Sequence, residues 1–301
     1  MNAEMNPAQN ATGSKTQFLS ASNFSGMKFN LASAKRFAKI TSLILQYAAS
    51  ASVGKFTIRD RNARLDFFTK NVGKYTKQAL ELFNMELKVV GYDPQMMKER
   101  NFLMIANHMS YIDILMVSSV QPCVFVTSVD MGEQFFLGDM AELGGSIFVE
   151  RRHRGTIGRD LGVMADTLRA GHNVVLFPEG TSTNGEGLLP FKKSLFMSAV
   201  ESGVDILPIC LKYTEIDGEP FSPANRDRMC WYGDMDFFSH FMGLMNLKKV
   251  KAELHFLEPI AVTKDSTRQE LAQKTFDAIN AVYTGSPASK VSWEKPVEAS
   301  L

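Results

Sequence analysis

Two stretches near the N-terminus carry apolar residues at the spacing of an amphipathic helix. In the first, the residues that share one helical face are Phe37, Ile40, Ile44, Tyr47, Ala48 and Ala51, and the opposite stripe is Lys35, Lys39, Ser42, Gln46 and Ser50. A break around Gly54 separates it from the second, where Leu65, Phe68, Val72, Tyr75, Ala79 and Leu82 lie opposite Lys70, Lys74 and Lys77. The pattern predicts an amphipathic two-helix hairpin over residues 27–84.

From about Met85 the pattern changes to short β-rich runs that alternate with helical stretches. The runs are ELKVVG, NFLMIAN, CVFVTSV, SIFVER, NVVLFPE, DILPICLKY and AELHFLEPI. The clearest helix runs from Ile157 to Ala170, where Gly171 supplies a stop signal. A last helix, with Ser266 as its predicted cap, runs to about Tyr283. This alternation predicts an α/β domain over residues 85–285, with a mixed, largely parallel sheet flanked by helices.

The two ends of the chain lack both patterns. Residues 1–26 are rich in Asn, Ser, Ala and Gly and lack the charged-then-apolar layout of a secretory signal. We therefore predict a disordered tail over residues 1–26 and a second one over residues 286–301.

The near-neutral total charge hides an uneven distribution. Between Lys28 and Lys77 the chain has eleven Lys and Arg residues against two acidic ones, a local balance of +9, so a total of +1 leaves −8 for the remainder. Two basic amphipathic helices in succession can lie in a membrane interface and favour an anionic surface as partner. The same helices could instead cover the domain's own core, and both interpretations stay open. The region never reaches the ~18 uninterrupted apolar residues of a spanning helix, so we expect interfacial contact.

A histidine and an aspartate follow the second β-rich run, in the stretch NHMSYID. Ser110 is a good helix cap and Asp113 comes three residues later, so a helix is expected to begin near Tyr111, with His108 on the loop before it. From there the Asp113 carboxylate can orient one imidazole nitrogen and leave the other free to accept a proton. The alternative is a first-turn acid beside a structural histidine, and the spacing leaves both open.

A second polar stretch, FPEGTSTNG, follows a buried strand and contains Glu179 and Gly180. Strand ends of this kind are where open α/β sheets place ligands, and glycine lets backbone N–H groups approach an anion. Lys192 and Lys193 follow at the next expected helix start and suit an anionic group. A surface loop with solvated lysines is the alternative.

A third stretch, GSIFVERRHR, ends a short strand in arginines, and Arg151, the first of them, is the best candidate for an inward role. The chain has no G-x-S-x-G elbow, dinucleotide fingerprint or HExxH motif, and its histidines lack metal-ligand spacing, so we expect no metal. The three scattered cysteines (Cys123, Cys210 and Cys230) indicate reduced thiols in a cytosolic setting.

Together these stretches resemble the glycerophospholipid acyltransferase family, which includes 1-acylglycerol-3-phosphate and other lysophospholipid acyltransferases. NHMSYID is similar to its NH-x4-D block, GSIFVER to its second block and FPEGTSTNG to its FPEG block. ILPI, with Pro208, is similar to its fourth block. The four blocks stand in family order within residues 85–260.

The resemblance implies transfer of a fatty acyl group from acyl-CoA or acyl-carrier protein to a lysolipid hydroxyl, without a further cofactor. His108 would be the general base and Asp113 its orienting carboxylate, while Arg151 and the segment from Glu179 to Thr181 would hold the acceptor headgroup. The family's membrane-contacting two-helix element would correspond to residues 27–84. We therefore expect membrane lipids and no nucleic acid as partners, and a place on the cytoplasmic face of the inner membrane.

One departure from the family pattern concerns the acceptor. Acyltransferases for 1-acylglycerol-3-phosphate commonly carry arginine directly after F-P-E-G-T, where this chain has Ser182. We expect 1-acylglycerol-3-phosphate first, with other lysophospholipids or lyso-ornithine lipid as alternatives. A non-catalytic lipid-binding protein and a thioester or lipid hydrolase are the rival classes.

Overall fold

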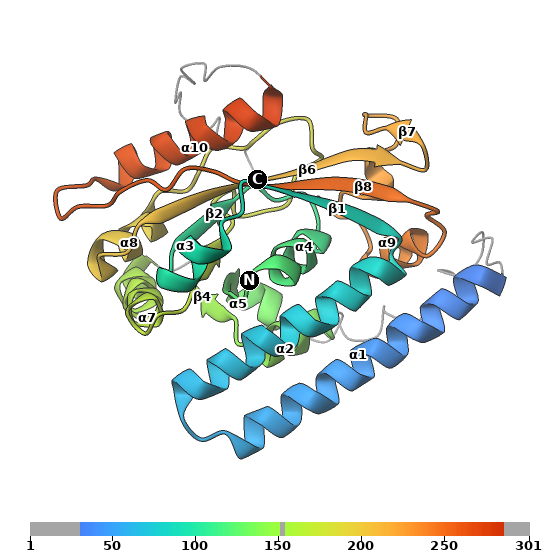
Figure 1. The fold of residues 1–301 in the computed structure, drawn as a ribbon, viewed down its shortest axis with the longest axis horizontal. Coiled ribbons are helices and arrows are strands. Elements are labelled where there is room, and N and C mark those ends of the chain that lie inside the picture. Colours follow the sequence, from blue (N-terminus) through green and yellow to red (C-terminus); the bar gives the residue numbers. More distant parts are fainter. Residues whose placement is uncertain (1–30, 151–153, 286–301) are drawn as a thin grey trace, which may run out of the picture.

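The computed structural model describes residues 31–150 and 154–285. The two predicted tails and Arg151 lie outside the described residues. Within the described part, residues 31–82 form a pair of long helices and residues 85–284 form an α/β fold (Figure 1).

The predicted N-terminal hairpin is present as helices α1 (Leu31–Thr57) and α2 (Arg61–Leu82). Asp60 caps α2 by accepting a hydrogen bond of 2.8 Å from the Ala63 N–H. The break predicted around Gly54 is wrong, because α1 continues through this residue to Thr57. Gly54 instead lies directly against the Phe67 ring of α2, which a Cβ at this position would displace.

All seven predicted strands are present in one mostly parallel sheet. They are β1 (Met85–Val90), β2 (Leu103–Ala106), β3 (Val124–Ser128), β4 (Ile147–Val149), β5 (Val174–Leu176), β6 (Ile206–Ile216) and β8 (Val250–Phe256). The order across the sheet is β1-β8-β6-β2-β5-β3-β4. Only the pairs that β6 makes with β8 and with the short β7 (Glu219–Pro220), which the sequence pattern missed, are antiparallel in the described sheet.

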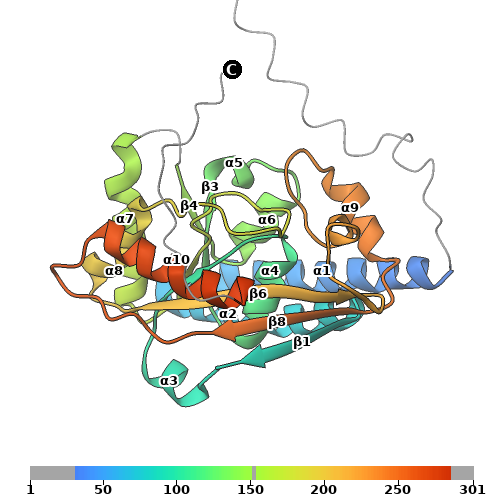
Figure 2. The ribbon, with the colours of Figure 1, turned by 90° about the horizontal axis from the view of Figure 1, so that it is seen from above.

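The sheet is covered on both faces. The remaining helices are α3 (Pro94–Glu99), α4 (Ile112–Val120), α5 (Val129–Gly132), α6 (Leu137–Leu143), α7 (Ile157–Arg169), α8 (Met197–Ser202), α9 (Phe237–Leu244) and α10 (Arg268–Thr284). Figures 1 and 2 show α10 over one face and α4 with the hairpin over the other.

Strand β2 lies at the centre of the sheet and divides its side chains between two cores. Leu103 and Ile105 belong to the cluster that contains residues of α7, α8 and α10, whereas Met104 and Ala106 belong to the cluster that contains residues of α4 and α2. A continuous apolar run is typical of a strand buried on both faces. The next residue of the chain, Asn107, therefore emerges at the carboxyl edge of the sheet, where ligands bind in open α/β folds.

The last helix is capped one residue later than the sequence pattern predicted. The Thr267 hydroxyl accepts a hydrogen bond of 3.2 Å from the Glu270 N–H, and α10 begins at Arg268. Ser266 instead accepts a hydrogen bond from the Thr263 N–H in the preceding turn. The predicted end near Tyr283 is confirmed.

Candidate active site

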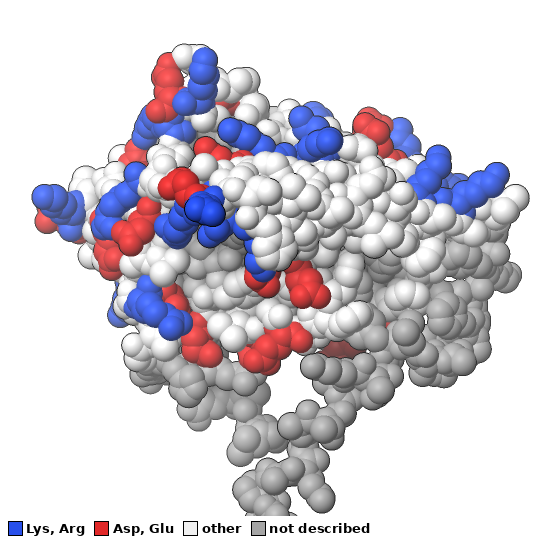
Figure 3. Space-filling view, turned by 90° about the horizontal axis from the view of Figure 1, so that it is seen from below, with Lys and Arg blue, Asp and Glu red and all other residues white. Residues whose placement is uncertain are grey.

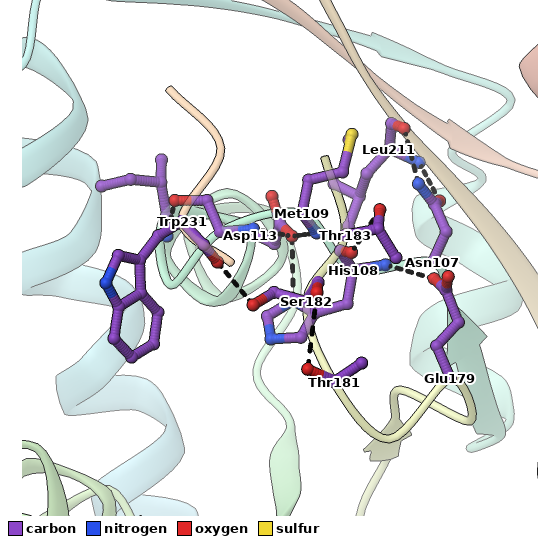
Figure 4. Close-up of polar contacts among 12 residues, drawn as sticks. Asn107, His108, Met109, Asp113, Glu179, Thr181, Ser182, Thr183, Leu211 and Trp231 are labelled. Carbon is purple, nitrogen blue, oxygen red and sulfur yellow. Dashed lines mark hydrogen bonds and ion pairs between the residues drawn. The ribbon is translucent and has the colours of Figure 1, made fainter. Parts of the chain in front are cut away.

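His108 and Asp113 form a hydrogen-bonded pair at the carboxyl end of β2 (Figure 4). His108 Nδ1 lies 2.9 Å from Asp113 Oδ2. The Asp113 side chain is fully buried, whereas the His108 side chain keeps about one fifth of its surface exposed. Because a carboxylate only accepts, the geometry assigns the hydrogen to Nδ1 and leaves Nε2 as the acceptor of a neutral imidazole.

Both interpretations of Asp113 hold in part, because this carboxylate is a first-turn acid of α4 and also the hydrogen-bond partner of His108. Oδ2 also accepts from the backbone N–H groups of Met109 at 2.6 Å and Ser110 at 2.9 Å. The predicted Ser110 cap is wrong, because α4 begins at Ile112 with Tyr111 as its N-cap and without a side-chain cap hydrogen bond, although Asp113 does lie in the first turn as expected. The start of α4 therefore fixes the carboxylate that orients His108, and Asp113 is oriented by local backbone structure.

The backbone of His108 is held by the FPEG turn. Glu179 accepts from the His108 N–H through Oε1 and from the Leu189 N–H through Oε2, both at 2.8 Å. Burial raises the pKa of Glu179 to about 7, against the two backbone hydrogen bonds, which lower it. The Thr183 N–H donates to the His108 carbonyl at 2.9 Å. Glu179 therefore joins the loop that carries His108 to the loop after β5, and it is not among the residues that line the cavity beside His108.

The imidazole plane is set by a second residue of the same turn. The His108 ring is stacked on Phe177, with centroids 4.1 Å apart and planes at 16°. Gly180, at φ +75°, turns the chain away after Phe177, and its N–H donates to the Phe177 carbonyl at 3.1 Å. A side chain is disfavoured there because that φ favours glycine, and a Cβ would also displace the end of the Lys192 side chain.

A cavity of about 500 Å³ extends from His108 between the sheet and the N-terminal helices. Its walls include Ile40 and Ile44 of α1, Tyr75 of α2, and Phe237 and Phe241 of α9. None of the described residues that line it is Lys, Arg, Asp or Glu. A deep apolar cavity with a few convergent polar groups at one end suits a ligand with a long hydrocarbon chain.

Ser182 lies in the cavity wall next to Thr181, and its hydroxyl donates to the Trp231 carbonyl (Figure 4). The Trp231 N–H in turn donates to the Met109 carbonyl at 2.8 Å. The segment around Trp231 thus joins the FPEG loop to the loop that carries His108. The Ser182 side chain serves this connection and adds no charge to the site.

Comparison with known proteins identifies the family. Residues 87–212 match the family described as Acyltransferase. A lyso-ornithine lipid O-acyltransferase of Rhizobium meliloti is 32% identical over 199 residues, which are 64% of this chain and 67% of the relative. A 1-acyl-sn-glycerol-3-phosphate acyltransferase of Neisseria gonorrhoeae is 30% identical over 206 residues, 68% of this chain and 78% of the relative. The chain belongs to the acyltransferase family.

The fold agrees with this assignment. The crystal structure of the 1-acyl-sn-glycerophosphate (LPA) acyltransferase PlsC from Thermotoga maritima is similar to this acyltransferase with a TM-score of 0.61 at 21% identity. The match covers 88% of this chain and 97% of that one. The resemblance drawn from the four sequence blocks is thereby confirmed at the level of the family and the fold.

The structure brings five of the predicted site residues together, His108, Asp113, Glu179, Gly180 and Thr181, whereas Arg151 lies outside the described residues. His108, Gly180 and Thr181 line the cavity, and Asp113 lies directly behind His108. Lys192 lies against Gly180, but neither it nor Lys193 is among the residues lining the cavity.

Two further side chains of the site were missed by sequence reasoning. The Tyr213 hydroxyl donates to Asp113 Oδ1 at 2.7 Å. The Asn107 side chain donates to the Leu211 carbonyl at 3.0 Å and accepts from the Leu211 N–H at 2.8 Å. Asn107 could have been suspected from its place beside His108 in NHMSYID, whereas Tyr213 sits 100 residues from Asp113 and carries no local signal.

Proposed function

We propose that this acyltransferase moves a fatty acyl group from a thioester donor, acyl-CoA or acyl-carrier protein, to the free hydroxyl of a lysolipid. The observation that carries the proposal is the His108–Asp113 hydrogen bond of 2.9 Å at the mouth of an apolar cavity. A neutral imidazole with its other nitrogen oriented by a carboxylate is the arrangement of a general base.

In the proposed reaction His108 Nε2 takes the proton of the acceptor hydroxyl as its oxygen attacks the thioester carbonyl carbon. The Asp113 carboxylate stabilises the imidazolium that forms, and it stays ionised throughout. The tetrahedral intermediate collapses with loss of the thiolate, which receives the proton from His108 and leaves as a thiol. An ester bond forms and a thioester bond breaks, so no covalent acyl-enzyme and no redox cofactor are required.

The cavity suits the hydrocarbon chain of the donor. Its described lining is apolar apart from hydroxyl groups, His108 and backbone, and it begins beside the imidazole. An acyl chain that fills it would gain the hydrophobic free energy of burial and place its carbonyl carbon near Nε2.

For the acceptor, Ser182 favours a lysolipid without a phosphomonoester, such as lyso-ornithine lipid, over 1-acylglycerol-3-phosphate, the first expectation from the sequence. The hydroxyl of Ser182 is engaged with Trp231, and an arginine at this position would instead offer a bidentate cation to a dianionic phosphate. 1-Acyl-sn-glycerol-3-phosphate stays the second candidate, because a relative of similar identity carries that name.

The remaining site assignments divide into two roles. We propose Gly180 and Thr181 as contacts of the acceptor, since both line the cavity beside His108. Arg151, Lys192 and Lys193 remain candidates for the headgroup. For Glu179 the two hydrogen bonds to backbone support a positioning role, because both oxygens are already used.

We also propose that the hairpin of residues 27–84 lies in the membrane interface, beside an acyltransferase domain of residues 85–285. Helix α1 buries Ile40, Leu43 and Ala51 toward the protein but exposes Leu45, Val53 and Phe56 to solvent. Figure 3 shows a broad uncharged area on this side of the molecule, with Lys and Arg side chains along its upper edge and several Asp and Glu side chains along its lower edge. No helix among the described residues is long and apolar enough to cross a membrane.

An apolar row flanked by cations is typical of a helix that lies in an interface, with lysines toward the headgroups. The second interpretation, a hairpin that covers the core, describes the other side of the same helices, because α1 and α2 supply part of the cavity wall. Cytosolic acyl donors would reach such a site from the cytoplasmic face of the inner membrane, where we place the enzyme.

The test supplies the purified full chain with labelled acyl-CoA or acyl-carrier protein and a panel of lysolipids in mixed micelles. We expect labelled diacyl lipid, with lyso-ornithine lipid preferred to 1-acylglycerol-3-phosphate. Labelled fatty acid released without any acceptor would favour a hydrolase, and lipid binding without turnover would favour a binding protein. Either result would contradict the proposed function.

A further inference from the structure

The Asp113 carboxylate has two oxygens, and only one of them faces His108. Oδ2 receives three hydrogen bonds, from His108 Nδ1 and from the N–H groups of Met109 and Ser110. Oδ1 receives the Tyr213 hydroxyl at 2.7 Å. The orientation of the carboxylate therefore depends on a donor outside the loop before α4.

Tyr213 belongs to β6, a strand distant in sequence from Asp113 but fixed in space against the catalytic loop. Strand β6 pairs with β2 along Leu103–Ala106. Beyond that ladder, the Asn107 side chain makes two hydrogen bonds to the backbone of Leu211. Asn107 thus extends the β2–β6 connection from the end of β2 to Leu211, two residues before Tyr213, and so ties the strand that carries the hydroxyl to the residue next to His108.

Burial keeps the phenol of Tyr213 protonated and therefore a donor. Tyr213 is 4% exposed, and Asp113 is fully buried. Desolvation, followed by the neighbouring Asp113 charge, raises the pKa of Tyr213 well above its ordinary value. A buried carboxylate oxygen that lost this donor would lose a hydrogen bond to a charged group, one of the stronger kinds in proteins.

We propose that Tyr213 is a positioning residue of the acyl-transfer reaction, which holds the Asp113 carboxylate in the plane that keeps His108 oriented as base. The proposal rests on the proposed role of His108. With Tyr213 in place, the carboxylate shares its charge between the hydroxyl on Oδ1 and the imidazole on Oδ2. Without the hydroxyl, the carboxylate becomes more basic and holds an imidazolium proton more tightly, while rotation about its Cβ–Cγ bond becomes easier.

Other titratable groups lie near this pair and enter any pH profile. Burial raises the pKa of the Cys230 thiol and of the Tyr283 phenol, so both stay neutral near pH 7. The Glu179 carboxyl has a pKa of about 7 and is coupled electrostatically to Asp113. Because Glu179 is present in the wild type and in a Tyr213 variant alike, only a difference between their two profiles reports on the hydroxyl.

The test compares Tyr213→Phe with Tyr92→Phe, a matched control. Tyr92 also donates its hydroxyl to a side chain, Gln121 Oε1 at 2.8 Å, but that side chain is not part of the His108–Asp113 pair. Both variants lose one hydroxyl group and one hydrogen bond of similar length. Steady-state kcat and KM for donor and acceptor, the pH profile of kcat/KM and the thermal unfolding midpoint are measured for each.

We expect Tyr213→Phe to lower kcat roughly tenfold to a hundredfold, the equivalent of one hydrogen bond to a charged group, with KM changed less than about twofold. The acidic limb of its pH profile should move to higher pH by roughly half a unit to one unit. Tyr92→Phe should leave kcat and the acidic limb unchanged. If Tyr213→Phe matches Tyr92→Phe in kcat and in the acidic limb of the pH profile, or changes KM alone, the positioning role is wrong while the role of His108 stands. If His108→Ala retains full activity, both are wrong.

Discussion

At the scale of single residues, the proposed chemistry depends on the Asp113 carboxylate, which bonds both the loop before α4 and His108. Asp113, in the first turn of α4, accepts through Oδ2 from the N–H groups of Met109 and Ser110 in the preceding loop, and the same oxygen lies 2.9 Å from His108 Nδ1. The spacing of NHMSYID places Asp113 in the first turn of α4 and within hydrogen-bond distance of His108, which is why the sequence alone could indicate the pair.

Substitutions of Ser182 test whether this single residue selects the acceptor lipid. Ser182→Arg should raise the ratio of kcat/KM for 1-acylglycerol-3-phosphate over that for lyso-ornithine lipid by about tenfold, because a guanidinium can bind a phosphomonoester bidentately. Ser182→Ala is the control, since it removes the hydrogen bond to Trp231 without adding charge. An unchanged ratio in Ser182→Arg would show that this position does not select the acceptor.

The raised pKa of Glu179 predicts how the free energy of unfolding changes with pH. Its pKa in the folded state, about 7, lies above the ordinary 4.5, so the folded state keeps the proton to a higher pH than the unfolded chain. The stabilisation is complete below about pH 4.5 and is lost as pH rises through about 7. Relative to Glu179→Gln, the wild type should lose about 2–3 kcal/mol of unfolding free energy between about pH 5 and about pH 8.

Denaturant unfolding over this pH range measures the effect. Glu201→Gln, a change at an exposed carboxylate near the end of α8, is the control and should reproduce the wild-type slope. Parallel curves for wild type and Glu179→Gln would mean that burial does not shift the Glu179 pKa as described.

At the scale of elements, periodicity predicted the strands well and the hairpin only in part. Seven β-rich runs became strands because each is short, apolar and bounded by polar residues. Helix α1 has apolar residues on two sides. The sequence pattern was read for one apolar face opposite one polar stripe, so it missed the exposed row with Leu45, Val53 and Phe56. Helices α5, α6 and α9 are short, and each contributes apolar side chains to the cavity wall, so no clean core-facing period marks them.

The exposed row of α1 carries the element-scale prediction. Leu45→Glu and Val53→Glu should each weaken binding to vesicles that contain anionic lipid by roughly tenfold, because each removes about 1.5–3 kcal/mol of apolar burial in the interface. Val163→Glu is the control, since Val163 is also partly exposed but lies on α7, which packs on the other face of the sheet. Equal binding by all three variants and the wild type would contradict an interfacial hairpin.

At the scale of the whole molecule, the site is assembled from segments far apart in the chain. The hairpin and α9 wall the cavity, β2 presents His108, β5 leads into the FPEG turn and β6 presents Tyr213. The hairpin is also bonded to the segment that follows α9, because Arg36 donates to the carbonyls of Met245 at 2.9 Å and Leu247 at 2.6 Å. Arg36 therefore serves the fold, although its charge counted toward the basic N-terminal balance in the sequence.

Contacts of this kind mark the limit of prediction from the sequence. Local spacing could indicate His108 with Asp113, and it could indicate the turn at Gly180, because each signal spans only a few residues. The pairing of Tyr213 with Asp113, and of Ser182 with Trp231, arises only when the sheet brings separate strands and loops to one edge. The sequence analysis expected Glu179 to hold the acceptor headgroup. Its hydrogen-bond partners, the His108 and Leu189 N–H groups, are brought to it only by the fold, so local sequence could not indicate them.

The central claim is that His108 acts as the general base of acyl transfer. It is tested most directly by the rate of labelled acyl transfer to lysolipid in His108→Ala and in His255→Ala, under saturating substrates. His255 is the matched control, because it also pairs with a carboxylate, Glu253 Oε2 at 2.8 Å, but does not line the cavity. The account predicts that His108→Ala lowers kcat by roughly a hundredfold to ten-thousandfold while His255→Ala keeps the wild-type rate. Undiminished transfer by a folded His108→Ala enzyme would contradict it.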